Sequence, residues 1–273
     1  MFSKIICATV LSLFFAGSVS AQEIHGFLQV EGTSSALMPK LARAWVNLNA
    51  RASPSTTIFI QMDGVAAELL DAEISSVVGM ATDATLAVRA GNLLTPAGMI
   101  IPSPQDEQLV GGPAVGQLVQ FYAQGAEVLG SWRSLQVRIG LVRGVSRLTE
   151  LLGSVAYSGS AAKAAATFQT TGQYSRASAM WHVGSPTIYM ETHVAAEVVG
   201  KISWAGSIIG GFELHERITL TAQADEIRIP TKADDHQLRL QVATKIAGVT
   251  FAIQEAWSSV SSFVTTVRLQ GAF

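Results

Sequence analysis

Side chains in the last eleven residues of the chain, 263–273, alternate between apolar and polar with a period of two. One side is nearly all apolar and has an aromatic ring at each end, whereas the opposite side carries Arg268 and Gln270. Successive side chains of a strand point to opposite faces, so this segment is predicted to be a strand between two different environments. Ten steps of about 3.3 Å, tilted by about 40°, rise about 25 Å, which is the height of the apolar band on a membrane-spanning barrel.

The same alternation recurs along most of the chain, in segments bounded by Gly, Pro, Ser or Asp. It is clearest at residues 41–51, 85–93, 187–198 and 237–246, and it is weak at 163–171, which fits a helix as well as a strand. The basic residues on the polar side are Arg43, Arg51, Arg89, Arg138, Arg239, Lys245 and Arg268. The acidic residues on the polar side are Glu31, Asp63, Asp71, Glu73, Glu127, Glu191 and Glu197. Strands with one apolar and one charged face predict a barrel that is apolar outside and wet inside.

Turn lengths predict the number of strands. Single-chain bacterial barrels have an even number of strands, with short turns on the periplasmic side and longer loops outside. Residues 52–55 and 247–248 fit short turns, whereas 95–116 and 226–236 fit long loops. Counts from the two ends of the chain agree only if a further, weak strand lies near residues 150–158. We therefore expect an all-β, transmembrane, antiparallel up-and-down barrel of sixteen strands, with fourteen as the alternative.

Residues 95–116 interrupt the alternation with four prolines and four glycines. Proline removes a backbone donor from a sheet, so this segment is predicted to be the third outer loop. A mobile surface loop is one interpretation. The other is that its apolar residues pack inside the barrel, because exposing them to water costs about 25 cal/mol per Å². In that arrangement Asp106 and Glu107 would narrow the pore opposite Arg43, Arg89 and Arg138.

Composition and the N-terminus indicate an exported envelope protein. Hydrophobic residues make up 49% of the chain and charged residues 14%, against about 25% in typical soluble proteins. Residues 1–21 fit a signal peptide, with Lys4, a short apolar run and small residues before the cleavage point, so 22–273 would form the barrel. The single cysteine, Cys7, lies in that peptide. The net charge of −2 does not suggest a nucleic-acid partner.

Several motifs resemble those of a known family. The segments 42–50, 58–63 and 88–98 are similar to strands of Gram-negative outer-membrane porins, in particular the phosphate-selective O/P-type branch. The final strand ending on Phe273 resembles the C-terminal strand of outer-membrane barrels, in which the last aromatic residue is read by the barrel-assembly machinery. The resemblance implies a homotrimer in the outer membrane, with the third loop folded into the pore. The chain departs from the branch in its short length and in lacking a dense Lys and Arg ladder in that loop.

These observations predict a porin, a water-filled channel through which small polar solutes and ions diffuse passively. The residues expected to line or narrow the pore are Arg43, Arg51, Arg89, Asp106, Glu107, Arg138, Arg239 and Arg268. The alternatives are a non-conducting structural or adhesive barrel and a secreted β-sandwich. No enzyme is expected, because His193 lies near Glu191 without a nucleophile at a recognisable spacing. No histidine spacing indicates a metal site, and no cofactor is expected.

Overall fold

The computed structural model of the chain describes residues 22–34, 36–66, 68–95, 117–118, 122–143, 149–171, 173–185, 187–261 and 263–272. Three predictions fall outside these ranges. They are the signal peptide at 1–21, the inward loop with Asp106 and Glu107, and the terminal aromatic Phe273. The described part of the chain contains no helix that is long and apolar enough to cross a membrane.

The described residues form sixteen strands. They are β1 (Gln22–Thr33), β2 (Ala36–Ser53), β3 (Thr56–Asp63), β4 (Glu68–Ala81), β5 (Ala84–Leu94), β6 (Tyr122–Trp132), β7 (Leu135–Arg143), β8 (Thr149–Ser158), β9 (Ala162–Thr170), β10 (Ser175–Ser185), β11 (Ile188–Val199), β12 (Lys201–His215), β13 (Ile218–Arg228), β14 (Asp235–Ile246), β15 (Val249–Ser258) and β16 (Val264–Ala272).

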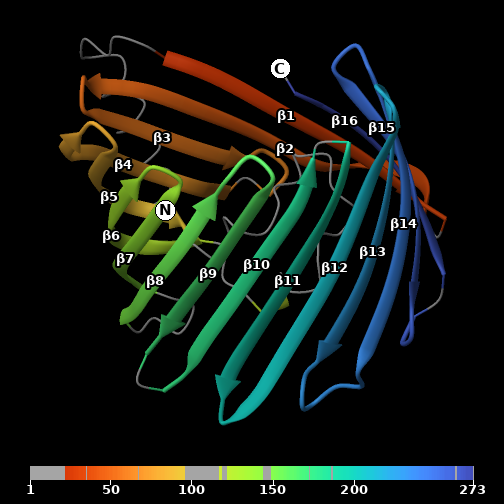
Figure 1. Cartoon of the computed structure of the whole chain (residues 1–273). Helices are drawn as coiled ribbons and strands as arrows, with labels where there is room; N and C mark the ends of the chain where they lie inside the picture. The colour runs from red at the N-terminus through yellow and green to blue at the C-terminus, as the bar shows by residue number, and fades with distance from the viewer. Residues whose placement is uncertain are drawn as a thin grey trace.

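Each strand pairs antiparallel with the next one along the chain, and β1 pairs with β16, so the sheet closes into a barrel. Figure 1 shows the closure, with the red first strand beside the blue last strand. The predicted fold class and the count of sixteen are confirmed. The weak strand expected near 150–158 is β8, and the segment for which a helix was equally compatible is β9. One prediction was wrong. In the sequence the alternation that leads into β6 begins at Leu118, which predicts a strand from that residue, but Leu118 itself lies in a turn and β6 begins at Tyr122.

Side chains alternate between the inside and the outside of the barrel as the period of two requires. On β7, Ile139 and Leu141 are each 58% exposed on the outer face, whereas Arg138 on the inner face is 2% exposed. The outer face is therefore apolar over most of the barrel. A soluble protein would not expose so large an apolar surface to water, so this face is suited to lipid.

Aromatic side chains mark both ends of this apolar face. Those at the end where β6, β8 and β12 finish are Trp132, Tyr157, Phe212 and Phe251. Those at the opposite end are Phe168, Trp257 and Phe263. Aromatic rings concentrate at the two water–lipid interfaces of membrane barrels, because one part of the ring system is apolar and the other tolerates water. The two belts indicate where the barrel leaves the membrane.

The turn between β14 and β15 is the tightest that the sequence predicted. Ala247 and Gly248 have φ angles of 49° and 82°, so both lie in the left-handed region. Two consecutive positive φ angles fit a two-residue hairpin whose twist matches that of the flanking strands. This turn lies at the end of the barrel assigned to the periplasm.

The two faces predict opposite responses to a new charge. Leu240 is 53% exposed on the outer face, so Leu240→Arg should cost about 2–4 kcal/mol near the middle of the membrane. Thr219 faces inward on the neighbouring strand β13 beside Glu213, and Thr219→Arg should cost less than about 1 kcal/mol. Urea unfolding in lipid vesicles measures both. Equal losses of stability would contradict the assignment of the faces.

Candidate functional site

The lumen wall carries most of the arginines that the alternation selected. The side chains of Arg43, Arg89, Arg138, Arg239 and Arg268 point inward from β2, β5, β7, β14 and β16. Arg51 is different, because it lies next to the β2–β3 turn at one rim of the barrel and is exposed. The inward arginines do not form one continuous basic wall, because neighbouring strands place carboxylates between them.

The most connected charge cluster lies on β4–β7. Arg89 donates to Glu127 Oε1 over 2.8 Å and also bonds Glu73, while Arg138 Nη2 lies 2.5 Å from the same Glu127 oxygen. Arg89 and Glu127 are directly opposite in the β5–β6 register, which brings the two charges together. The Glu127 side chain is only 1% exposed, so the pairs lie in a region of reduced dielectric. This cluster neutralises two guanidinium groups within the wall.

A second cluster lies on β12–β14. Asp225 accepts hydrogen bonds from Ser207 Oγ at 2.5 Å and from Gln223 Nε2 at 2.7 Å and 2.8 Å. Arg239 Nη1 lies 3.8 Å from Asp225 Oδ2, and Arg239 also donates to Gln237. The bonds cross three neighbouring strands and therefore hold these side chains in fixed positions along the wall.

Arg43 lies in an aromatic setting. Its guanidinium carbon is 5.4 Å from the centre of the Trp45 ring, a distance at which a cation is attracted to the ring face. The Trp45 indole donates to Asp63 over 3.3 Å, and its ring lies 5.8 Å from that of Phe27. Trp45 is thus part of the side-chain packing of the wall on β1–β3.

Two further carboxylates organise polar side chains on β8–β11. Glu150 is fully buried and accepts hydrogen bonds from Gln169 and Tyr174. Glu191 lies between two histidines, with His182 Nδ1 at 2.8 Å and His193 Nε2 at 3.2 Å. Among the residues that the structure describes, no group of three His, Cys, Asp or Glu side chains is arranged to hold a metal ion.

An apolar strip crosses the inner wall on β9–β13, and Leu118 packs on it. Leu118 is 7% exposed and clusters with four inward residues from four strands, which are Ala165, Ala195, Ala205 and Ile227. Leu94 at the end of β5 and Tyr122 at the start of β6 are paired neighbours in the wall. In the ring of sixteen strands β13 is seven places from β6, so Leu118 contacts the far wall from inside the barrel.

The position of Leu118 limits the width of the lumen at this level. Leu118 and Tyr122 are four residue steps apart, and four steps span at most about 14 Å. The chain therefore approaches the far wall within that distance of β6. Leu118 itself lies inside the lumen, against the apolar strip on β9–β13.

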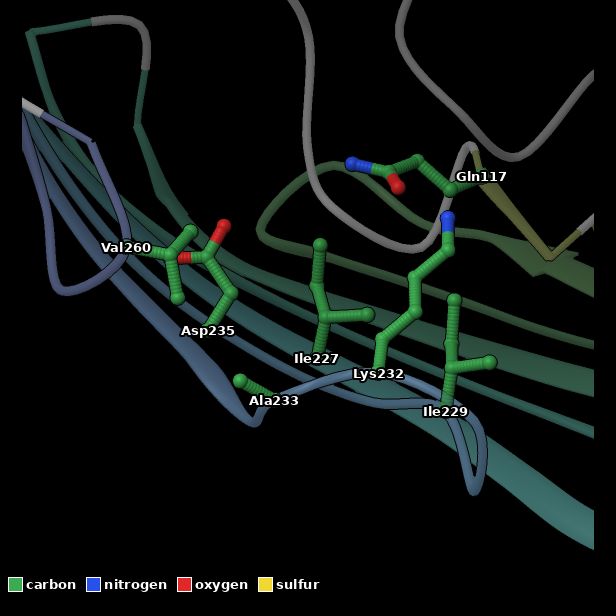
Figure 2. Close-up of a pocket in the computed structure, with 7 residues that line it drawn as sticks. All are labelled: Gln117, Ile227, Ile229, Lys232, Ala233, Asp235 and Val260. Atoms are coloured by element: carbon green, nitrogen blue, oxygen red, sulfur yellow. The ribbon is translucent and has the colours of Figure 1, made fainter.

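A small cavity of about 340 Å³ lies beside this crossing point, at the end where β13 finishes and β14 begins. Figure 2 shows the Lys232 side chain extending toward Gln117, with Ile227, Ile229 and Val260 on the same side of the cavity. Asp235, at its edge, accepts a hydrogen bond from Ser258 Oγ at 2.6 Å. The cavity is a mixed apolar and polar recess at the mouth of the barrel.

Sequence reasoning missed three residues that the structure brings into the lumen. Leu118 was assigned to a strand, because the period-two pattern runs on without a break from 118 into β6. Glu150 lies at the start of the weak strand, in step with the inward Leu152 and Ser154. Asp225 continues the alternation of Thr221 and Gln223, so extending that pattern by one step would have found it.

Comparison with known proteins identifies the fold. No family model matches the chain, and no curated protein matches it. Among solved structures, the trimer form of in-vitro folded OmpT from Vibrio cholerae has a TM-score of 0.69 and 11% identity, covering 93% of this chain and 99% of that chain. OmpF of Salmonella typhi in complex with daunomycin has a TM-score of 0.69 and 8% identity, covering 92% of this chain and 97% of that chain. A variant of the Rh. blastica porin has a TM-score of 0.65 and 12% identity, covering 93% of this chain and 100% of that chain.

The barrel has the fold of outer-membrane porins. At these low identities the similarity concerns the fold alone, and it extends over nearly the whole length of each neighbour. The Vibrio cholerae neighbour is an outer-membrane protein. The neighbours do not single out the phosphate-selective branch that the sequence motifs resemble.

The β4–β7 cluster predicts a large effect of removing its shared carboxylate. Glu127→Gln leaves Arg89 and Arg138 close together without the charge that both contact, which should destabilise the barrel by about 3–5 kcal/mol. Asp83→Asn removes a carboxylate from the exposed pair with Arg133 and should cost less than about 1 kcal/mol. Urea unfolding in lipid vesicles compares the two variants. A loss of stability in Glu127→Gln no larger than that in Asp83→Asn would show that the cluster is only a solvated set of charges.

Proposed function

We propose that this protein is an outer-membrane porin, a water-filled channel for passive diffusion of small polar solutes and ions. The observation that carries the proposal is a closed sixteen-strand barrel with an apolar outer face and a charged, hydrogen-bonded inner wall. A barrel whose inner side were only structural could be filled with apolar side chains. Rings of charged side chains instead favour the passage of hydrated solutes.

The mechanism requires no chemical step. Water in the lumen replaces lipid, and the fixed charges on β4–β7 and β12–β14 orient polar solutes as they pass. Leu118 packs on the inner wall at β9–β13 and is proposed to reduce the width of the lumen there. Asp106 and Glu107, in the segment before it, are proposed to lie at the constriction.

The cellular setting is part of the proposal. We expect residues 1–21 to be removed as a signal peptide, and the mature chain to be inserted by the barrel-assembly machinery into outer-membrane lipid. One neighbour is described as a trimer form, and the sequence resemblance also implies trimers, so a homotrimer is proposed. The phosphate-selective branch remains an expectation from the motifs at 42–50, 58–63 and 88–98.

One observation favours a second candidate, a non-conducting structural or adhesive barrel. Many inward side chains, among them Glu127, Arg138 and His193, are no more than 2% exposed. A plugged lumen would bury them in this way.

Conductance in planar lipid bilayers distinguishes the two candidates. Purified, refolded protein should produce discrete current steps in 1 M KCl. A barrel that shows the heat-modifiable gel mobility of a folded outer-membrane protein and yet gives no current steps would establish the non-conducting alternative.

Leu118 offers a specific test of the constriction. Leu118→Asp places a charge on the apolar strip formed by β9–β13, so the chain should leave the far wall and the single-channel conductance should rise by about 1.5-fold or more. Leu118→Met keeps the apolar contact and is the matched control, with conductance unchanged. Unchanged conductance in Leu118→Asp would show that this contact does not narrow the pore.

Phe273 offers a test of assembly. A terminal aromatic residue at the membrane interface is the proposed signal for insertion, so Phe273→Ser should lower the amount of barrel in outer-membrane fractions several-fold. Those Phe273→Ser molecules that do assemble should conduct normally. Phe273→Tyr keeps an interfacial ring and serves as the control. Normal membrane levels of the Ser variant would contradict the assembly role.

A further inference from the structure

The barrel separates its charges in a way that its composition does not reveal. The whole chain is nearly balanced, with 18 basic and 20 acidic residues. In the described part of the chain, only six basic side chains are buried or half-buried, and all six point into the lumen. They are Arg43, Arg89, Arg138, Arg176, Arg239 and Arg268.

Carboxylates are more numerous on the same surface. Eleven inward side chains of this kind are buried or half-buried in the described ranges. We call them the inner carboxylates, and they are Glu31, Asp63, Asp71, Glu73, Glu127, Glu150, Glu191, Glu197, Glu213, Asp225 and Asp235. Among the buried and half-buried side chains, the inner wall therefore has a formal surplus of about five negative charges with neutral histidines, whereas the whole chain has only −2.

The remaining basic residues of the described ranges lie on exposed positions, most of them near the ends of strands. Lys163, Lys201 and Lys245 stand close to strand ends, and Arg133, Arg217 and Lys232 lie in turns or loops. Water and salt screen charges at such sites within about 10 Å at 0.1 M ionic strength. The inner carboxylates are screened less, because they lie in a narrow, partly dry wall.

The positive charges of several inner arginines are balanced by carboxylates that they contact. Arg89 contacts both Glu73 and Glu127, Arg138 contacts Glu127, and Arg176 contacts Glu197. By contrast, Asp235 is bonded by the neutral side chains of Gln237 and Ser258, and Glu191 by His182 and His193. Hydrogen bonds from neutral groups hold a carboxylate in place without cancelling its charge. The electrostatic potential in the lumen is therefore negative on balance.

We propose that the inner carboxylates make the pore prefer cations over anions, so that its favoured solutes are small inorganic or organic cations. The proposal rests on the channel function proposed above and adds the charge class of the solute. It runs against the anion preference that the phosphate-selective resemblance would imply. A negative lumen raises the local concentration of cations and lowers that of anions, so cations carry most of the current at low salt.

The test is the reversal potential of the refolded protein in a planar bilayer under a KCl gradient centred on 0.1 M. The sign of that potential should correspond to preferential K⁺ permeation. The preference should shrink toward none when the gradient is centred on 1 M, because the screening length falls from about 10 Å to about 3 Å.

A pair of double variants isolates the inner wall. Glu31→Gln with Glu213→Gln removes two inward charges and should lower the K⁺/Cl⁻ permeability ratio by about half. Glu226→Gln with Glu255→Gln removes two half-buried carboxylates of outward parity on β13 and β15, which changes the net charge equally and should leave the ratio unchanged. Heat-modifiable gel mobility checks that both assemble. If the first pair does not assemble, Glu213→Gln with Asp235→Asn replaces it.

The outcomes separate this proposal from the function on which it rests. Current steps with a reversal potential near zero or of anion-selective sign would overturn the cation preference and leave the porin function intact. An equal fall in the ratio for both double variants would show that net charge, and not the inner wall, sets the preference. Absence of any current steps would overturn the porin function and the cation preference together.

Discussion

Backbone hydrogen bonding in lipid is the constraint on which the rest of this structure depends. A peptide group that faces hydrocarbon finds no water, so every donor and acceptor has to be satisfied within the protein. An open sheet would leave two unpaired edges. The chain avoids them by pairing β1 with β16 over seven residue pairs, from Phe27–Ala272 to Thr33–Thr266. The first and last strands must therefore pair for the barrel to be stable.

Closure of the ring also decides where charge is placed. Once each strand has one face in lipid, every second side chain lies in the lumen, and the register decides which ones meet. Arg89 is opposite Glu127, and the next strand brings Arg138 to the same carboxylate. Burial makes these contacts mutually dependent, because a charge that loses its partner in a region of low dielectric has no water to replace it. The wall is thus a set of coupled side chains rather than a row of independent charges.

The interior also contains a region of a different kind. Small alanines on β9, β11 and β12 leave room against the wall, and Leu118 occupies it. Apolar contact is favourable there because both surfaces would otherwise face water in the lumen. The apolar strip and the β12–β14 cluster share strands, because Ala205 lies two residues from Ser207 on β12 and Ile227 lies two residues from Asp225 on β13. That arrangement places a narrow passage beside carboxylates whose charge is only partly compensated.

Local alternation was sufficient to predict most strands of this protein. A period of two depends only on neighbouring residues, so it can be recognised in segments such as 41–51 and 237–246. The even count of sixteen strands followed from the turn lengths near the two ends of the chain. The same reasoning misplaced Leu118, because a period-two pattern continues through a stretch whether or not a partner strand is present to pair with it.

The sequence by itself determined the two faces of the wall, the number of strands and the inward direction of Arg43, Arg89, Arg138, Arg239 and Arg268. Only the tertiary structure decided which carboxylate each arginine meets, because the register between strands depends on bulges such as those at Gln29/Val30 and Val77/Gly79. It also decided that Arg51 lies at an exposed rim and that inner carboxylates outnumber inner arginines. A composition close to neutral cannot reveal such a separation, because it arises from which side of each strand faces the lumen.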